Sequence, residues 1–138
     1  MKSTKSASPP NSYATAWWLA TLVVAAALYY VALSDTVYNV TSPPGPFQIL
    51  LRKSYSIAAF ALVGWLFARA SSASGRPRSA LFVAFSVAAY SALIELGQAI
   101  GQAHEGLLWN LVDVACGFLG GLLGAVVLRW RKIAAAPP

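Results

Sequence analysis

Four long apolar blocks that carry almost no charge constrain this chain more than any other feature. They span approximately residues 14–33, 49–69, 80–102 and 107–128. Each block is close to the roughly 20 residues that a helix needs to cross the hydrocarbon core of a bilayer. Soluble domains are about 25% charged, whereas this chain is 10% charged and 58% hydrophobic. The sequence therefore predicts an all-α, integral membrane four-helix bundle with the lipid bilayer as its solvent.

The first block follows Lys2 and Lys5, an arrangement that secretory signal peptides share. Its apolar stretch is longer than the roughly 7–15 residues of a signal core, and no small-x-small cleavage site follows it. We therefore expect a retained helix. With this helix included, the transmembrane domain covers residues 14–128, between tails at 1–13 and 129–138.

Turn-forming segments separate the blocks. Residues 41–46 contain three prolines and a glycine, which exclude regular helix. Residues 71–78 again contain turn formers, now together with positive charge. The last connection, 103–106, is so short that the third and fourth helices should form an antiparallel hairpin.

The distribution of positive charge predicts the orientation in the membrane. With four spans, the two tails and the middle loop share one side, which carries eight basic residues and no acid: Lys2, Lys5, Arg69, Arg76, Arg78, Arg129, Arg131 and Lys132. The other side carries Arg52 and Lys53 beside Asp35 and Glu105. Because basic residues are retained in the cytoplasm, both termini should be cytoplasmic in a bacterial-type plasma membrane, with residues 43–46 and His104 outside. The net charge of +6 then reflects topology and gives no reason to expect a nucleic acid partner.

Polar side chains inside the blocks indicate a candidate site. A carboxylate in the membrane interior costs at least about 2.5 kcal/mol, so it tends to face protein or a wet cavity. Glu95 and Gln98 share one face of the third block with Ser91. Both could also serve only as hydrogen-bonding contacts between helices.

The fourth block carries Asp113 at the head of a row of small residues. The row holds four glycines that permit close helix packing: Gly117, Gly120, Gly121 and Gly124. Because the hairpin is short, we expect Asp113 and Glu95 to face each other.

Lys53 begins the second block at a depth similar to that of the two acids. It could be an interfacial lysine whose ammonium reaches for water. Partly desolvated opposite charges should pair, however, and this favours an outward-facing polar pocket of Lys53, Glu95, Gln98 and Asp113.

The sequence gives little support for other chemistry. His104 and Glu105 could extend the pocket toward a metal, but one histidine with exposed acids falls short of a ligand set, so no metal or cofactor is predicted. Cys116 is expected to be a packing residue. No serine–histidine–acid arrangement and no phosphate-binding loop is recognisable.

Two segments resemble the paired motif of VanZ-like membrane proteins, in which E-x-x-Q is followed by D-V-x-x-N-x-x-G-G-x-x-G. Here Glu95-Leu96-Gly97-Gln98 precedes Asp113-Val114 and the glycines at 120, 121 and 124. The segment 53–60 further resembles the K-x-x-H-x-x-x-Y start of an earlier helix in that family. Gly117, Ser56 and Phe60 stand where the family usually has asparagine, histidine and tyrosine, and the arginine often found before the aspartate is absent.

The resemblance implies work at the cell envelope, since the name-giving member is associated with low-level resistance to the glycopeptide teicoplanin. We expect a pocket that binds or senses an envelope component, such as a lipid-linked or cell-wall ligand. One alternative is a membrane enzyme acting on such a precursor, with Glu95 as acid or base and Asp113 orienting it. A second is a structural subunit of a larger complex, whose partner protein the sequence does not identify.

Overall fold

The residues that the structure describes form four membrane-length helices, α1 (Ser12–Ala32), α3 (Gln48–Ala73), α4 (Ala80–Ile100) and α5 (Leu107–Ala134). All four are long and apolar enough to cross a bilayer, which confirms the predicted all-α membrane bundle. The computed structural model describes residues 12–34, 36–37, 40, 46–100 and 107–134, without the side chain of Lys132. The predictions for residues 1–11 and 135–138 of the tails, and for Asp35, residues 43–45, His104 and Glu105, lie outside these residues.

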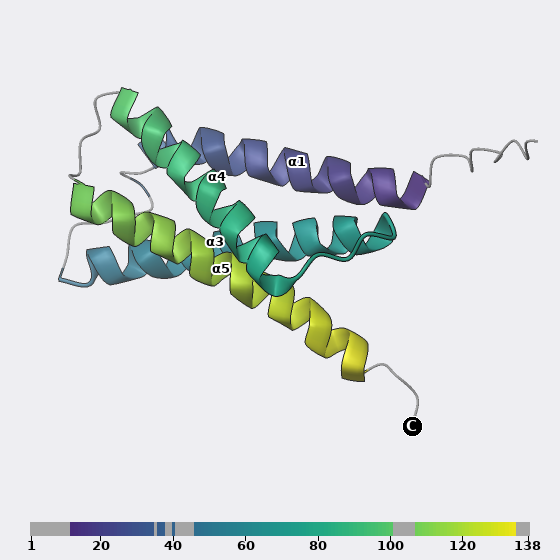
Figure 1. The fold of residues 1–138 in the computed structure, drawn as a ribbon. Helices are drawn as coiled ribbons and strands as arrows, with labels where there is room; N and C mark the ends of the chain where they lie inside the picture. Colours follow the sequence, from purple (N-terminus) through teal and green to yellow (C-terminus); the bar gives the residue numbers. More distant parts are fainter. Residues whose placement is uncertain (1–11, 35, 38–39, 41–45, 101–106, 135–138) are drawn as a thin grey trace, which may run out of the picture.

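Successive helices run in opposite directions (Figure 1). The start of α1, the turn between α3 and α4, and the end of α5 lie together at one end, which we call the basic end because Arg69, Arg76, Arg78, Arg129 and Arg131 are there. The end of α1 and the starts of α3 and α5 lie at the opposite end, which we call the pocket end. This places the elements that should share the cytoplasm at one end of the bundle.

Two helices extend beyond their expected ends. The apolar blocks predicted helices that stop at residues 69 and 128, but α3 continues to Ala73 and α5 to Ala134. The charges at these positions mark the edge of the apolar span and do not end the helix, because arginine is a good helix former. The helix end and the membrane edge are therefore different boundaries.

The helix α5 packs closely against both α3 and α4. Its glycines form two rows, although the sequence suggested a single one. A Cβ atom added at Gly120 would lie 2.6 Å from the Cβ of Phe60 in α3, and one added at Gly124 would meet Ala61 of the same helix. These two glycines bring the backbones of α5 and α3 together.

The second row of glycines faces α4. A Cβ atom at Gly117 would lie 2.6 Å from the Cβ of Ser91, and one at Gly121 would lie 2.8 Å from that of Val87. Because a helix turns by about 100° per residue, Gly117 and Gly120 point about 60° apart and can serve different neighbours. Side chains added at Gly120 and Gly124 would thus meet α3 and those added at Gly117 and Gly121 would meet α4, although the backbone of Gly121 also lies against Gly64 of α3.

The helix α1 lies at the periphery and buries only Ala14 and Thr21. Long side chains attach it to the rest of the bundle. In the interior, the hydroxyl of Tyr90 in α4 donates a hydrogen bond to the carbonyl of Ala25, 2.5 Å away. Partly buried side chains of α1, among them Val24, Leu28 and Tyr29, also pack against the hydrophobic core.

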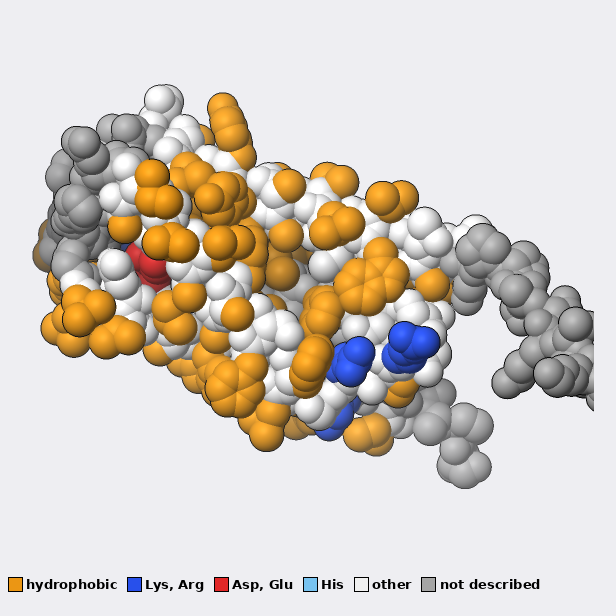
Figure 2. Space-filling view, turned by 45° about the horizontal axis from the view of Figure 1, so that its top comes forward, with side chains coloured by type: hydrophobic (Ala, Val, Ile, Leu, Met, Phe, Trp, Pro, Cys, Tyr) orange, Lys and Arg blue, Asp and Glu red, His pale blue; other side chains and the backbone are white. Residues whose placement is uncertain are grey.

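The outer surface of the bundle is largely apolar. Large hydrophobic side chains are exposed on every helix, among them Leu22, Leu62, Phe85 and Leu123. Figure 2 shows hydrophobic side chains covering the middle of one face, with basic side chains gathered toward the basic end. A surface of this kind fits a lipid environment and would be costly in water.

Candidate functional site

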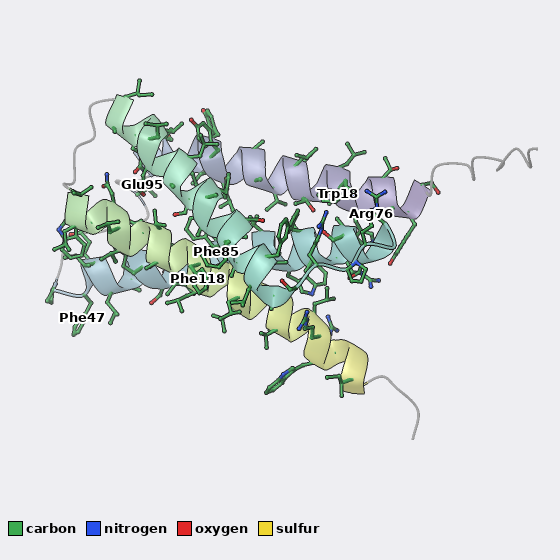
Figure 3. The ribbon with its side chains drawn as sticks, viewed as in Figure 1. Trp18, Phe47, Arg76, Phe85, Glu95 and Phe118 are labelled. Atoms are coloured by element: carbon green, nitrogen blue, oxygen red, sulfur yellow. The ribbon has the colours of Figure 1, made fainter. Side chains whose placement is uncertain are left out.

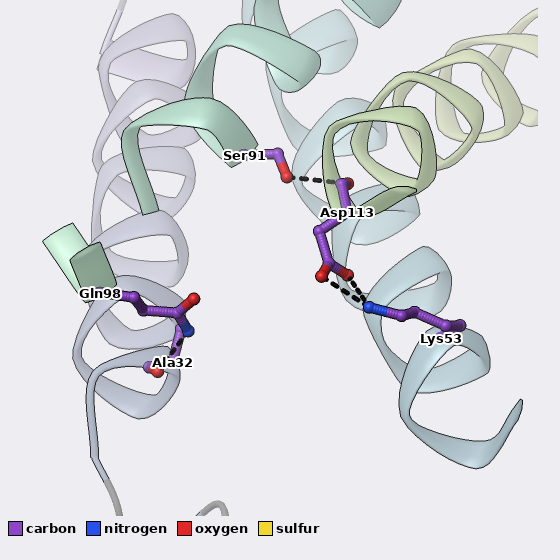
Figure 4. Close-up of polar contacts among 5 residues, drawn as sticks. All are labelled: Ala32, Lys53, Ser91, Gln98 and Asp113. Carbon is purple, nitrogen blue, oxygen red and sulfur yellow. Dashed lines mark hydrogen bonds and ion pairs between the residues drawn. The ribbon is translucent and has the colours of Figure 1, made fainter. Parts of the chain in front are cut away.

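A close ion pair joins α3 and α5 at the pocket end of the bundle. The ammonium nitrogen of Lys53 lies 2.6 Å from each carboxylate oxygen of Asp113 (Figure 4). Each side chain is 15% exposed. The pair is thus partly withdrawn from solvent, and each charge compensates the other in a setting where an isolated charge would be costly.

The packing of α3 on α5 explains why these two residues meet. The helices run in the same direction (Figure 1), so a constant offset in residue number relates positions at equal height. Lys53 and Asp113 are 60 positions apart, and so are Phe60 and Gly120, which are in contact about two helical turns further along. The glycine row therefore sets the register that brings the lysine to the aspartate.

A pocket of about 240 Å³ opens beside the ion pair and is lined by Ile49, Arg52, Lys53 and Trp109. The ammonium of Lys53 lies 5.6 Å from the centre of the Trp109 ring, within range of a cation–π interaction. Two basic side chains, an aromatic ring and an aliphatic side chain thus surround one small space.

Three of the lining residues, Ile49, Arg52 and Trp109, were not among those predicted from the sequence. Ile49 precedes Lys53, and Trp109 precedes Asp113, by one helical turn of four residues on the same face. That spacing was a usable signal. It was missed because a tryptophan and an isoleucine near a membrane edge are normally assigned to the lipid interface.

Asp113 is directed at α3, whereas we expected it to face Glu95 across the α4–α5 hairpin (Figure 4). Its contact with α4 runs through the backbone, since the buried hydroxyl of Ser91 donates to the Asp113 carbonyl at 2.9 Å. Glu95 lies one turn further along α4, partly exposed, toward the pocket end (Figure 3). Asp113 is thus the acid that forms the ion pair with Lys53.

Gln98 contacts α1, not the ion pair. Its amide nitrogen donates to the carbonyl oxygen of Ala32 at 2.9 Å (Figure 4). Ala32 is the last residue of α1, where backbone carbonyls have no partner within the helix. This is the contact between helices that the sequence analysis kept as an alternative for Gln98.

Within the described residues, no group of three or more His, Cys, Asp or Glu side chains could hold a metal ion. His104 and Glu105, the residues considered for a metal, are outside that part of the chain. Cys116 is buried in α5, as expected of a packing residue.

Comparisons with protein-family models, curated proteins and solved structures produced no match to this chain.

Proposed function

We propose that this chain is a VanZ-like integral membrane protein of a bacterial-type plasma membrane. In this proposal both termini are cytoplasmic, the pocket end faces outward, and the pocket binds the anionic head group of a lipid-linked or cell-wall component. The single observation that carries the proposal is the 240 Å³ pocket with Arg52, Lys53, Ile49 and Trp109 on its walls.

The lining supports an anionic amphiphile as the ligand. Guanidinium and ammonium groups are the usual partners of phosphate and carboxylate oxygens. Trp109 and Ile49 offer apolar contact beside these charges, and both side chains are substantially exposed. A ligand with a charged head and an apolar chain matches both parts of this lining at a membrane boundary.

The outward orientation is supported by the positive charges. The described arginines at the basic end belong to the side with eight basic residues in the sequence, against two on the side of the pocket. That asymmetry favours a cytoplasmic basic end.

Binding is better supported than catalysis. A catalytic role was considered for Glu95, with Asp113 orienting it. Both carboxylate oxygens of Asp113 accept hydrogen bonds from Lys53, however, so its carboxylate is engaged with α3. Asp113 therefore serves to hold the Lys53 ammonium beside the pocket.

A cysteine-protection experiment on the purified protein tests this proposal. In a Cys116→Ser background, Ile49→Cys places a thiol on the pocket wall, and its maleimide-labelling rate is measured with dodecyl phosphate or dodecyl maltoside present. We expect saturable protection by the phosphate and much weaker protection by the maltoside, because only the phosphate is charged.

The ratio of protection by dodecyl phosphate to protection by dodecyl maltoside is then measured after a second substitution. Arg52→Gln should weaken protection by dodecyl phosphate, whereas Arg131→Gln, the same chemical change at the basic end, should leave it unaltered. Equal protection by both detergents, or an Arg52→Gln ratio equal to that of Arg131→Gln, would rule out an anion-binding pocket.

A further inference from the structure

The turn between α3 and α4 is tightly structured and carries two exposed arginines, Arg76 and Arg78. Three consecutive backbone N–H groups in it donate to carbonyls at the end of α3: Ser74 to Ala70, Gly75 to Ser72, and Arg76 to Ser71, at 3.0–3.1 Å. Gly75 adopts a positive φ of 70°, which glycine tolerates without strain. The backbone that presents both guanidinium groups is therefore held in place.

A chain of aromatic contacts packs against this turn. The indole N–H of Trp18 in α1 donates to the Ser74 hydroxyl at 2.9 Å, and its ring meets Phe67. Phe67 stacks on Phe82, and the guanidinium of Arg78 lies 4.8 Å above the Phe82 ring. Trp18 and Arg76 lie at the same end of the molecule in Figure 3. These aromatic contacts thus hold Arg78 at the edge of the apolar surface, at the basic end.

The last turns of α5 add two more arginines at this end. Arg129 and Arg131 are exposed, and so are the neighbouring apolar side chains Trp130 and Ile133, at 72% and 74%. Charged and large apolar side chains alternate here on a helix that continues past its apolar span. This composition suits a lipid headgroup region, where one part of the surface is wet and the other is apolar.

Arg69 differs from these four arginines. Its guanidinium donates to the Tyr13 hydroxyl at 2.6 Å and lies 5.2 Å from the Trp17 ring, so it fastens α1 to α3. We therefore define the basic surface as Arg76, Arg78, Arg129 and Arg131. Among the described residues the acids are Glu95 and Asp113, and both lie toward the pocket end.

We propose that the basic surface binds the phosphate head groups of acidic phospholipids in the leaflet at the basic end. Four exposed guanidinium groups lie where the apolar belt of the bundle ends, which is the depth of lipid phosphates. Arginine binds phosphate oxygens with two parallel hydrogen bonds, and a basic cluster beside membrane helices attracts anionic lipids. The exposed Trp130 and Ile133 favour a lipid over a water-soluble anion, because they would contact acyl chains.

The experiment measures which lipids surround the basic end. The full chain, with Cys116→Ser and Val127→Cys, is labelled with a fluorophore and placed in lipid nanodiscs; Val127 is exposed on α5 one turn before Arg131. Quenching by spin-labelled phosphatidylglycerol is compared with quenching by spin-labelled phosphatidylcholine at equal mole fraction. We expect stronger quenching by the anionic lipid, and added salt should reduce the difference because it screens charge.

Two pairs of substitutions test the residues themselves. Arg76→Gln with Arg78→Gln, and Arg129→Gln with Arg131→Gln, should each lower the enrichment severalfold, since one basic side chain at an acidic surface changes partitioning by about fivefold. The corresponding Arg→Lys pairs should keep most of the enrichment, which separates loss of charge from loss of structure.

Arg52→Gln is the matched control, because it removes the same charge at the pocket end and should leave the enrichment unchanged. The inference is overturned if the intact protein shows equal quenching by the two lipids, or if all the glutamine variants including Arg52→Gln behave alike. The result is independent of ligand binding in the pocket, since the fluorophore reports only on the basic end.

Discussion

At the scale of single residues, the Lys53–Asp113 pair is the feature on which the site depends. Each charge satisfies the other in a partly desolvated position between α3 and α5. Removing one partner of a buried pair typically costs about 3–5 kcal/mol because the other charge is left alone, whereas losing an exposed pair costs about 1 kcal/mol or less. The two cases can be distinguished experimentally.

We predict that Lys53→Ala markedly lowers the thermal stability of the detergent-solubilised protein, toward the larger of these two magnitudes. Adding Asp113→Asn should recover part of the loss, because the neutral amide does not need a cation. The measurement is the unfolding midpoint of the two variants against wild type.

Arg129→Ala supplies the control, since it removes an exposed basic side chain and should leave the midpoint nearly unchanged. A Lys53→Ala midpoint equal to that of Arg129→Ala would mean that Lys53 is only an interfacial anchor. The sequence could predict that Lys53 pairs with an acid at similar depth. It could not choose between Glu95 and Asp113, because that choice depends on the packing register of α3 against α5.

At the scale of the helices, the two glycine rows of α5 determine which elements approach closely. A Cβ atom at Gly124 would meet backbone atoms of α3, including the Trp65 nitrogen at 2.5 Å, whereas one at Gly97 would meet the Tyr29 hydroxyl at 2.6 Å. Backbone atoms of a packed helix cannot move aside, but the end of a tyrosine side chain can rotate. The two glycines should therefore respond differently to the same substitution.

We predict that Gly124→Ala destabilises the bundle by about 1–3 kcal/mol or more, the range typical of overpacking in a close-packed interior. Gly97→Ala should cost less, and it is the matched control because it adds the same methyl group to a helix. Unfolding midpoints of the two variants provide the test. Equal losses would show that the close approach of α5 to α3 has no special role in stability.

The packing and the ends of the helices could be predicted from the sequence only in part. Small residues on α5 indicated a close helix contact. Read as a single row, however, they could not show that side chains at Gly117 and Gly121 would face α4 while those at Gly120 and Gly124 would face α3. The assignment requires knowing on which sides of α5 its neighbours lie. The helix ends could not be predicted from hydropathy either. Hydropathy marks the edge of the membrane, and α3 and α5 continue past that edge.

At the scale of the whole molecule, charge and polarity are separated along the bundle axis. The ion pair and its pocket lie at one end. The exposed arginines lie at the other, beyond an apolar surface (Figure 2). Four apolar blocks were sufficient to predict this separation. Because successive helices run in opposite directions, the first and third connections lie at one end, and the middle connection lies at the other end with the two termini. The pocket was not predictable in the same way, since its walls come from the first turns of two helices that are far apart in sequence.

The central claim, a pocket that opens on the outer face of a membrane bundle, is tested most directly by labelling intact cells. In a Cys116→Ser background, Ile49→Cys on the pocket wall and Ser74→Cys in the turn at the basic end are each exposed to a membrane-impermeant maleimide. We predict that Ile49→Cys is labelled from outside and that Ser74→Cys is labelled only after the membrane is permeabilised. Labelling of Ser74→Cys in intact cells, with Ile49→Cys protected until permeabilisation, would contradict the account.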